Sequence, residues 1–237
     1  MSDLSFPPLF RGEAAPDGMD PMAKAVSAAV LGCDPGLIVH NKGGDTLSAA
    51  LVLTPEAALE DAMAMVFAAS LGFSDALGAL APPEVAVHMD WPGGIRVNGA
   101  RCGGLRASAS TRDPAAEPDW LVIALDIHVS GISDEPGAAP DRTVLYEEGC
   151  ADVDPFRLLE SWSRHTLVWI NTWLDGGMAR LHADWRARAY RMGEDVTFTM
   201  NGTVHSGIFV GIDERGGMLL RDGVETRLIP LSTMLED

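Results

Sequence analysis

The feature that most constrains this chain is the stretch from residue 85 to 106, VAVHMDWPGGIRVNGARCGGLR. Residues 85–90 alternate between one apolar set and one polar set, which is typical of a strand with one buried face. The corner Trp91-Pro92-Gly93-Gly94 ends that strand. Asn98-Gly99 follows between two short segments, and this dipeptide is the strongest short-range signal for a β-hairpin. The stretch therefore predicts a strand, a corner and a tight hairpin.

A two-residue turn fixes the register of this hairpin. It pairs Arg96 with Arg101 and Ile95 with Cys102, so that the two arginines share one face while Cys102 faces the other way. Like charges directly opposite each other destabilise a sheet. We therefore expect something acidic over the arginine face, either a carboxylate such as Asp90 or a bound anion. The alternative is a pair of solvated side chains on an exposed face.

Length and charge limit the fold and the partners. A chain of 237 residues with 47% hydrophobic content is long enough for one large globular domain and one small one. The formal net charge of −17 argues against nucleic acid and anionic membranes, because both are bound through a surplus of lysine and arginine. We expect neither as a partner.

The cysteines and the N-terminal residues indicate a compartment. The three cysteines are widely spaced and give neither a disulfide framework nor a zinc pattern, so no metal site is predicted. The first residues lack the basic and apolar regions of a signal peptide. No apolar run approaches the roughly 20 residues that span a bilayer. We expect a cytoplasmic protein.

Local signals predict where helices begin. The pairs Asp20-Pro21 and Asp154-Pro155 combine a capping residue with proline at the first helical position. Thr54-Pro55 has the same form and predicts a helix from there to about Gly72, with a separate short helix at 74–80. Residues 1–20 are expected to be irregular.

The strands are predicted from apolar runs bounded by turn residues. In the first part of the chain they are expected at 37–39, 47–53, 104–110 and 120–129. The run 120–129 is nearly continuous in apolar residues, so it should lie centrally with both faces covered. From Gly193 onward short strands alternate with turns, which predicts an all-β module of roughly 45 residues that would be marginal alone.

These motifs resemble a known family. Trp91-Pro92, the hairpin, and the run from Arg101 to Leu105 (RCGGL) resemble the central segment of the biotin protein ligase and lipoate ligase superfamily. That segment has Lys-Trp-Pro-Asn-Asp, a short hairpin and Lys-Leu-Ala-Gly-Ile-Leu. Gly211-Ile212-Asp213, followed by Met218-Leu219-Leu220, is similar to the C-terminal SH3-like barrel of biotin ligases.

The resemblance implies a fold and a division into domains. The fold class is α+β, with a mixed β-sheet flanked by helices, like the catalytic domain of biotin ligases and class II synthetases. This domain is expected over residues 1–190, and a small SH3-like β-barrel over residues 191–237. We expect no DNA-binding winged helix of the kind that some family members carry.

The resemblance also implies site residues and ligands. Arg101 stands where the family has the lysine that contacts the carboxylate of the acid and the adenylate, and Asp90 stands at the first lysine of the motif. These two are the predicted catalytic residues. The predicted substrate-binding residues are Trp91, Arg96, Arg106, Lys42 and His128. The implied ligands are a small carboxylic acid such as biotin or lipoate and ATP, the implied partner is a carrier-protein acceptor, and a homodimer is a further candidate.

The departures from the family pattern leave the activity open. The Gly-Arg-rich loop of biotin ligases is reduced here to residues 41–45, and Gly93-Gly94 replace Asn-Asp. We therefore do not expect authentic biotin transfer. Three alternatives stay open: a divergent ligase that binds a small carboxylic acid or its adenylate, a non-catalytic binding module with the ligase fold, and an acyltransferase that uses Cys102. For His88 we expect a hydrogen-bonded structural role.

Overall fold

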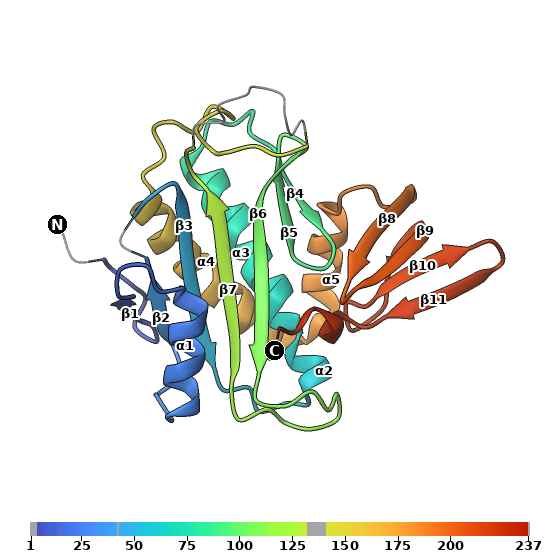
Figure 1. The fold of residues 1–237 in the computed structure, drawn as a ribbon, viewed down its shortest axis with the longest axis horizontal. Coiled ribbons are helices and arrows are strands. Elements are labelled where there is room, and N and C mark those ends of the chain that lie inside the picture. Colours follow the sequence, from blue (N-terminus) through green and yellow to red (C-terminus); the bar gives the residue numbers. More distant parts are fainter. Residues whose placement is uncertain (1–3, 42, 132–140, 237) are drawn as a thin grey trace.

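The computed structural model describes residues 4–41, 43–131 and 141–236. Figure 1 shows two sheets, a large one with helices on both faces and a small one beside it. The elements of the larger unit are β1 (Arg11–Ala14), α1 (Pro21–Val30), β2 (Leu37–His40), β3 (Thr46–Leu53), α2 (Leu59–Ala62), α3 (Ala64–Leu80), β4 (Val87–Asp90), β5 (Gly94–Val97), β6 (Ala100–Ala109), β7 (Leu121–His128), α4 (Pro155–Gly176) and α5 (Met178–Ala187). The C-terminal elements are β8 (Asp195–Met200), β9 (Thr203–Ile212), β10 (Met218–Asp222), β11 (Glu225–Ile229) and the 3-10 helix η1 (Leu231–Met234).

The large sheet is mixed, as predicted. Its strand order is β1-β2-β3-β7-β6-β5-β4, with β1 and β2 parallel and every other neighbouring pair antiparallel. Strand β7 lies in the middle, and its first five residues are all buried. The prediction of a central strand covered on both faces is confirmed.

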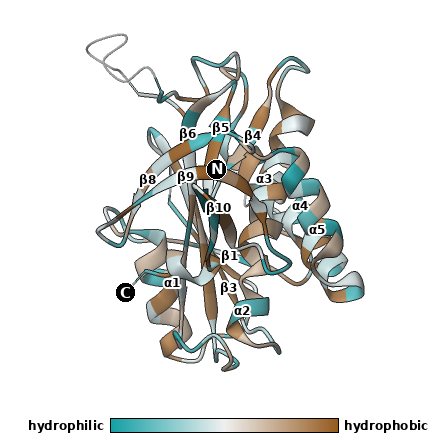
Figure 2. Ribbon diagram, turned by 90° about the vertical axis from the view of Figure 1, so that its right-hand side faces the viewer, coloured by the Kyte–Doolittle hydropathy of each residue, from teal (hydrophilic) through white to brown (hydrophobic). Residues whose placement is uncertain are grey.

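The two faces of the large sheet are covered unequally. Helix α1 packs on one face against β2, β3 and β7, whereas α3, α4 and α5 form the layer on the other face (Figure 2). In the described part of the chain, no helix covers the α1 face over β5 and β6. This uncovered half of the α1 face is where the candidate site lies.

Two helix starts follow local rules. The Asp20 carboxylate accepts the backbone N–H of Met22 at 3.1 Å, and the Asp154 carboxylate accepts those of Phe156 and Arg157 at 2.9 Å. Both helices begin with the proline that follows the aspartate. These predictions are confirmed.

The predicted helix start at Thr54-Pro55 is wrong. Helix α2 begins at Leu59, after Ala58, which offers no side-chain cap. Instead, the backbone N–H groups of Leu59 and Glu60 donate to carbonyl oxygens in the loop between β6 and β7, at 2.8 and 3.0 Å. A cap supplied from a distant loop leaves no trace in the neighbouring sequence.

The predicted helix end at Gly72 is also wrong, because α3 runs without a break to Leu80. Gly72 marks a close approach of two helices: a Cβ atom there would lie 2.3 Å from Thr166 Oγ1 on α4. By length and composition alone, the stretch Leu59–Leu80 could cross a membrane. The expectation that no apolar run is long enough for this is therefore wrong. Of the most apolar window of this stretch, 72% is buried inside the fold, as for a core helix.

The expectation that residues 1–20 are irregular missed one strand. Strand β1 pairs in parallel with β2 at the edge of the sheet. Its four residues are all exposed, so they carry no alternation of apolar and polar side chains.

The C-terminal strands form a separate antiparallel sheet in the order β11-β10-β9-β8. This arrangement confirms the fold class, including a small SH3-like module. The module packs against the larger unit, and the Trp91 indole N–H donates to the carbonyl of Gly216 at 2.9 Å. The boundary at residues 190/191 stays a prediction.

Candidate functional site

The hairpin at the centre of the prediction forms, with one change in register. Asn98 and Gly99 have φ angles of 50° and 91°, as the turn requires, and Arg96 pairs with Arg101. Ile95 pairs with Gly103, because the register shifts between Ile95 and Arg96. The predicted pairing of Ile95 with Cys102 is therefore wrong.

Two cavities lie beside this hairpin. The inter-module cavity, about 700 Å³, lies between the large sheet, the C-terminal module and the last residues of the chain. It is lined by Trp91, Pro92, Gly93, Gly94, Arg101, Leu105, Arg106, Arg112, Phe198, Thr199, Met200, Asn201, Met234, Leu235 and Glu236. The sheet cavity, about 480 Å³, is lined by Arg101, Gly103, Gly104, Leu105, Arg106, Asp126, His128, Asp141 and Arg142. Arg101, Leu105 and Arg106 line both cavities.

Glycines bring the backbone segments around the cavities close together. The Leu105 N–H donates to the Gly93 carbonyl at 2.7 Å, and a Cβ on Gly104 would lie 2.9 Å from that carbonyl oxygen. A Cβ on Gly103 would lie 2.1 Å from the carbonyl oxygen of Asp126 on β7. Side chains at Gly103 or Gly104 would therefore push these strands apart.

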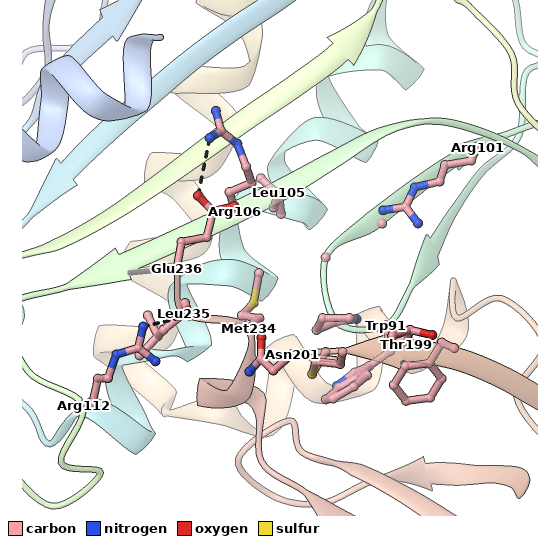
Figure 3. Close-up of a pocket in the computed structure, with 15 residues that line it drawn as sticks. Trp91, Arg101, Leu105, Arg106, Arg112, Thr199, Asn201, Met234, Leu235 and Glu236 are labelled. Carbon is pink, nitrogen blue, oxygen red and sulfur yellow. Dashed lines mark hydrogen bonds and ion pairs between the residues drawn. The ribbon is translucent and has the colours of Figure 1, made fainter. Parts of the chain in front are cut away.

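Arg101 is the exposed cation that borders both cavities. Its backbone is fixed, since its N–H donates to the Asp141 carbonyl at 2.7 Å and its carbonyl accepts from Thr143 at 2.9 Å. Within residues 4–41, 43–131 and 141–236, no carboxylate forms an ion pair with the Arg101 guanidinium. In Figure 3 this side chain lies on one side of the inter-module cavity, across from Asn201.

Arg96 has the acidic partner that the sequence predicted. Its Nε lies 3.0 Å from Asp90 Oδ2, and its guanidinium carbon lies 4.3 Å from the centre of the Tyr190 ring. Neither Arg96 nor Asp90 lines either cavity. Their predicted roles in substrate binding and catalysis therefore stay predictions.

Arg106 lies at the cavities but is already surrounded by carboxylates. Its guanidinium contacts Asp126 at 2.8 Å, Asp20 at 2.9 Å and Glu236 at 3.4 Å. The hydrogen bond from Arg106 lowers the pKa of Asp20 below its ordinary value, and the same bond raises the pKa of Arg106 further. Arg106 is thus paired with three carboxylates of the chain itself.

The remaining predicted residues are placed as follows. Trp91 lines the inter-module cavity, although it is almost buried. His128 lines the sheet cavity, and its Nδ1 lies 3.3 Å from Thr46 Oγ1. Lys42 lies outside the described residues. The buried Nδ1 of His88 has no hydrogen-bond partner among the described residues, so the expected hydrogen bond is absent at that atom.

Cys102 is buried, as the hairpin predicted. Its side chain is fully inaccessible, and its thiol donates to the carbonyl of His128 at 3.4 Å. Burial raises the pKa of the Cys102 thiol to about 12, and the nearby Cys150 and Glu148 add to the shift. A thiol in this environment stays protonated near neutral pH, which disfavours it as a nucleophile.

Sequence reasoning missed the contribution of the C-terminal residues. Phe198, Met200 and Asn201 from the small module line the inter-module cavity together with residues 234–236. The final residues reach it because Glu236 donates its backbone N–H to the Ala107 carbonyl at 2.8 Å. Strand β5 is too short to occupy that edge of β6, and no local signal in the sequence reveals this pairing.

Together, the mixed sheet, the small β-module and the cavities at the Trp-Pro corner define a protein of the biotin ligase fold. A model of the biotin/lipoate A/B protein ligase family matches residues 6–187. A second model, described as a domain of unknown function (DUF4444), matches residues 192–237. The chain belongs to the biotin/lipoate A/B protein ligase family, which confirms the resemblance seen in its motifs.

Individual proteins support this membership. The biotin–[acetyl-CoA-carboxylase] ligase of Paracoccus denitrificans is 32% identical over 185 residues, covering 76% of this chain and 75% of that protein. A biotin protein ligase-like protein of unknown function from Silicibacter sp. TM1040 has a TM-score of 0.91 and 54% identity, with 99% of this chain and 100% of that chain covered. Biotin protein ligase from Aquifex aeolicus, in complex with biotin and ATP, shares the fold with a TM-score of 0.70 and 16% identity, covering 97% and 96% of the two chains.

Proposed function

We propose that this protein binds a small carboxylic acid, or that acid as its adenylate, at the Trp-Pro corner. The observation that carries the proposal is Arg101: it borders both cavities, and its guanidinium has no carboxylate partner among the described residues. The names of relatives support the ligand class. One curated relative is a biotin ligase, and structures of the Aquifex aeolicus enzyme hold biotin or biotin with ATP.

The chemistry of Arg101 fits a carboxylate. A guanidinium presents two parallel N–H groups to the two oxygens of a carboxylate, and such charge-assisted bonds are stronger than neutral ones. The sheet cavity adjoins this group, and Gly103 and Gly104 contribute backbone atoms alone to its lining. The inter-module cavity adds Phe198 and Met200, which suit an apolar chain attached to the carboxylate.

We further propose that the protein does not transfer biotin to a carrier protein with ATP. Gly93 and Gly94 offer no side chain where the family has Asn-Asp, so they cannot supply metal ligands. The loop at residues 41–45 is too short to close over a ligand as the Gly-Arg-rich loop of the family does. These departures favour a non-catalytic binding module that keeps the ligase fold.

The acyltransferase alternative has less support. It needs Cys102 as a reactive thiolate, but this thiol is buried and its pKa is raised to about 12. Catalytic cysteines instead lie in exposed, electropositive surroundings that lower the pKa. Cys102 is better interpreted as a small apolar side chain behind the hairpin.

Binding measurements on the whole chain test the proposal. Isothermal titration with biotin, lipoate, octanoate and a non-hydrolysable acyl-adenylate analogue should identify at least one ligand. Arg101→Gln should weaken its binding by roughly 10- to 150-fold, the loss expected when a charge-assisted hydrogen bond of about 1.5–3 kcal/mol is removed. Arg227→Gln is the matched control, because Arg227 is exposed on β11 and lines neither cavity.

A second experiment tests the proposal that biotin is not transferred to a carrier protein. A biotin-acceptor domain is incubated with the protein, biotin and ATP and then analysed by mass spectrometry. We expect no added mass on the acceptor. ATP-dependent transfer that disappears in the Arg101→Gln variant would contradict the view that adenylation has been lost. Equal affinity of the wild-type and Arg101→Gln proteins for the bound acid would contradict the role of Arg101.

A further inference from the structure

The charged network at Arg106 limits which anions the two cavities can hold. Asp20 engages the outer edge of the guanidinium with both oxygens, at 2.9 and 3.0 Å. Asp126 accepts from Nε at 2.8 Å, and Glu236 lies 3.4 Å from Nη1. Four hydrogen bonds to the chain's own carboxylates therefore engage this guanidinium, which has five N–H groups, and its outer edge is fully taken by Asp20.

This network carries a net negative charge, because three carboxylates surround one guanidinium. Two of these carboxylates line the cavities. Glu236 lines the inter-module cavity, beside Arg106 in Figure 3, and Asp126 lines the sheet cavity. An anion placed beside Arg106 would thus meet carboxylates at short range on either side. Repulsion between like charges at short range opposes anion binding there, and solvent moderates it because these carboxylate side chains are 27–44% exposed.

Among the described residues, three arginines besides Arg106 line the cavities. Arg101 lines both, Arg142 lines the sheet cavity, and Arg112, whose Nη2 donates to the Leu235 carbonyl at 3.4 Å, lines the inter-module cavity. Arg96 is paired with Asp90 and lines neither cavity. Counted with Asp20, the described carboxylates of Asp126, Asp141 and Glu236 equal in number the four arginines that line the two cavities. The walls therefore offer no net positive charge to offset the several charges of a polyphosphate.

We infer that the site selects singly charged organic anions and excludes polyphosphates, with Asp20 and Glu236 as the residues that set this limit. The inference rests on the proposed function and narrows its ligand class. Carboxylates satisfy the limit, and so do acyl-adenylates, because their phosphate, esterified to adenosine and joined to the acyl group as a mixed anhydride, carries one charge. Pyrophosphate and nucleoside triphosphates do not. Asp20 and Glu236 act by keeping Arg106 occupied.

A gain of binding tests this limit. The double substitution Asp20→Asn with Glu236→Gln removes two charges while keeping the side-chain shapes, and asparagine still caps α1. It frees the outer edge of Arg106 for an added anion. Isothermal titration should detect little or no pyrophosphate binding to the wild-type protein. In the double variant, pyrophosphate should bind at least roughly tenfold more tightly.

Asp222→Asn with Glu225→Gln is the matched control. Both residues are exposed on the β10–β11 hairpin, so this variant changes the net charge equally without touching the cavities. It should gain no pyrophosphate binding. Thermal denaturation of each variant checks the fold, and Glu236→Gln alone should give a smaller gain if the double variant is unstable.

The outcomes separate this inference from the proposed function. Pyrophosphate binding to the wild-type protein as tightly as octanoate, or no gain in the double variant, would overturn the inference. A gain in the double variant with no acid bound by any form would support the limit set by Asp20 and Glu236 and contradict the proposed function.

Discussion

Gly72 and Gly78 lie in the same helix, α3, and offer a direct test of how the helical layer supports the site. A Cβ on Gly72 would lie 2.3 Å from Thr166 Oγ1 and 2.8 Å from the backbone N and Cα of Thr166. A Cβ on Gly78 would have nothing within 4 Å. The same substitution, glycine to alanine, should therefore have opposite effects at the two positions.

The magnitudes follow from two terms. Alanine improves helix propensity over glycine by roughly 0.5–1 kcal/mol, and at Gly78 this gain stands alone. At Gly72 the added methyl group forces α4 away, and overpacking of this kind costs about 1–3 kcal/mol or more. Because two of the three close atoms belong to the α4 backbone, we use the upper end, which leaves a net loss of about 2 kcal/mol.

Thermal denaturation of the two variants measures the difference. For a chain of this length, 1 kcal/mol corresponds to roughly 2–4 °C, so Gly72→Ala should lower Tm by about 4–8 °C. Gly78→Ala should leave Tm unchanged or raise it by up to about 4 °C. If Gly72→Ala stabilised the protein as much as Gly78→Ala, the close approach of α3 and α4 would be refuted.

Three further predictions concern individual side chains. Because Arg106 lowers the pKa of Asp20 in the folded state, the stability that Asp20 contributes should be present above about pH 4 and lost as the pH falls through the lowered pKa. The difference in urea midpoint between the wild-type and Asp20→Asn proteins should therefore shrink below pH 4, and a constant difference would contradict this. Iodoacetamide should label the partly exposed Cys33 of the native protein well before the buried Cys102, as peptide mass spectrometry would detect; equal labelling would contradict the burial. Trp91→Phe should lower stability by about 1–2 kcal/mol, since it leaves a buried carbonyl of the C-terminal module without its donor; an unchanged denaturation midpoint would refute the importance of that bond.

The sequence by itself determined the elements whose causes are local. Asp20 and Asp154 cap the helices that follow them, and Asn98-Gly99 adopts the positive φ angles of a two-residue turn. The apolar run at 121–128 became the central strand. These features depend on residues within a few positions of each other, so sequence patterns are sufficient to predict them. The hairpin register placed Arg96 and Arg101 on one face and called for an acidic partner there, and of the candidates left open Asp90 is the one that pairs with Arg96.

The tertiary structure alone decided how these elements meet. The start of α2 depends on carbonyl groups from a loop far along the chain, and the continuity of α3 through Gly72 depends on where α4 crosses it. The carboxylates around Arg106 come from residues 20, 126 and 236. The C-terminal residues reach the site because β5 leaves part of the β6 edge unpaired. Long-range pairing depends on the lengths and positions of distant elements, and no local sequence pattern encodes it.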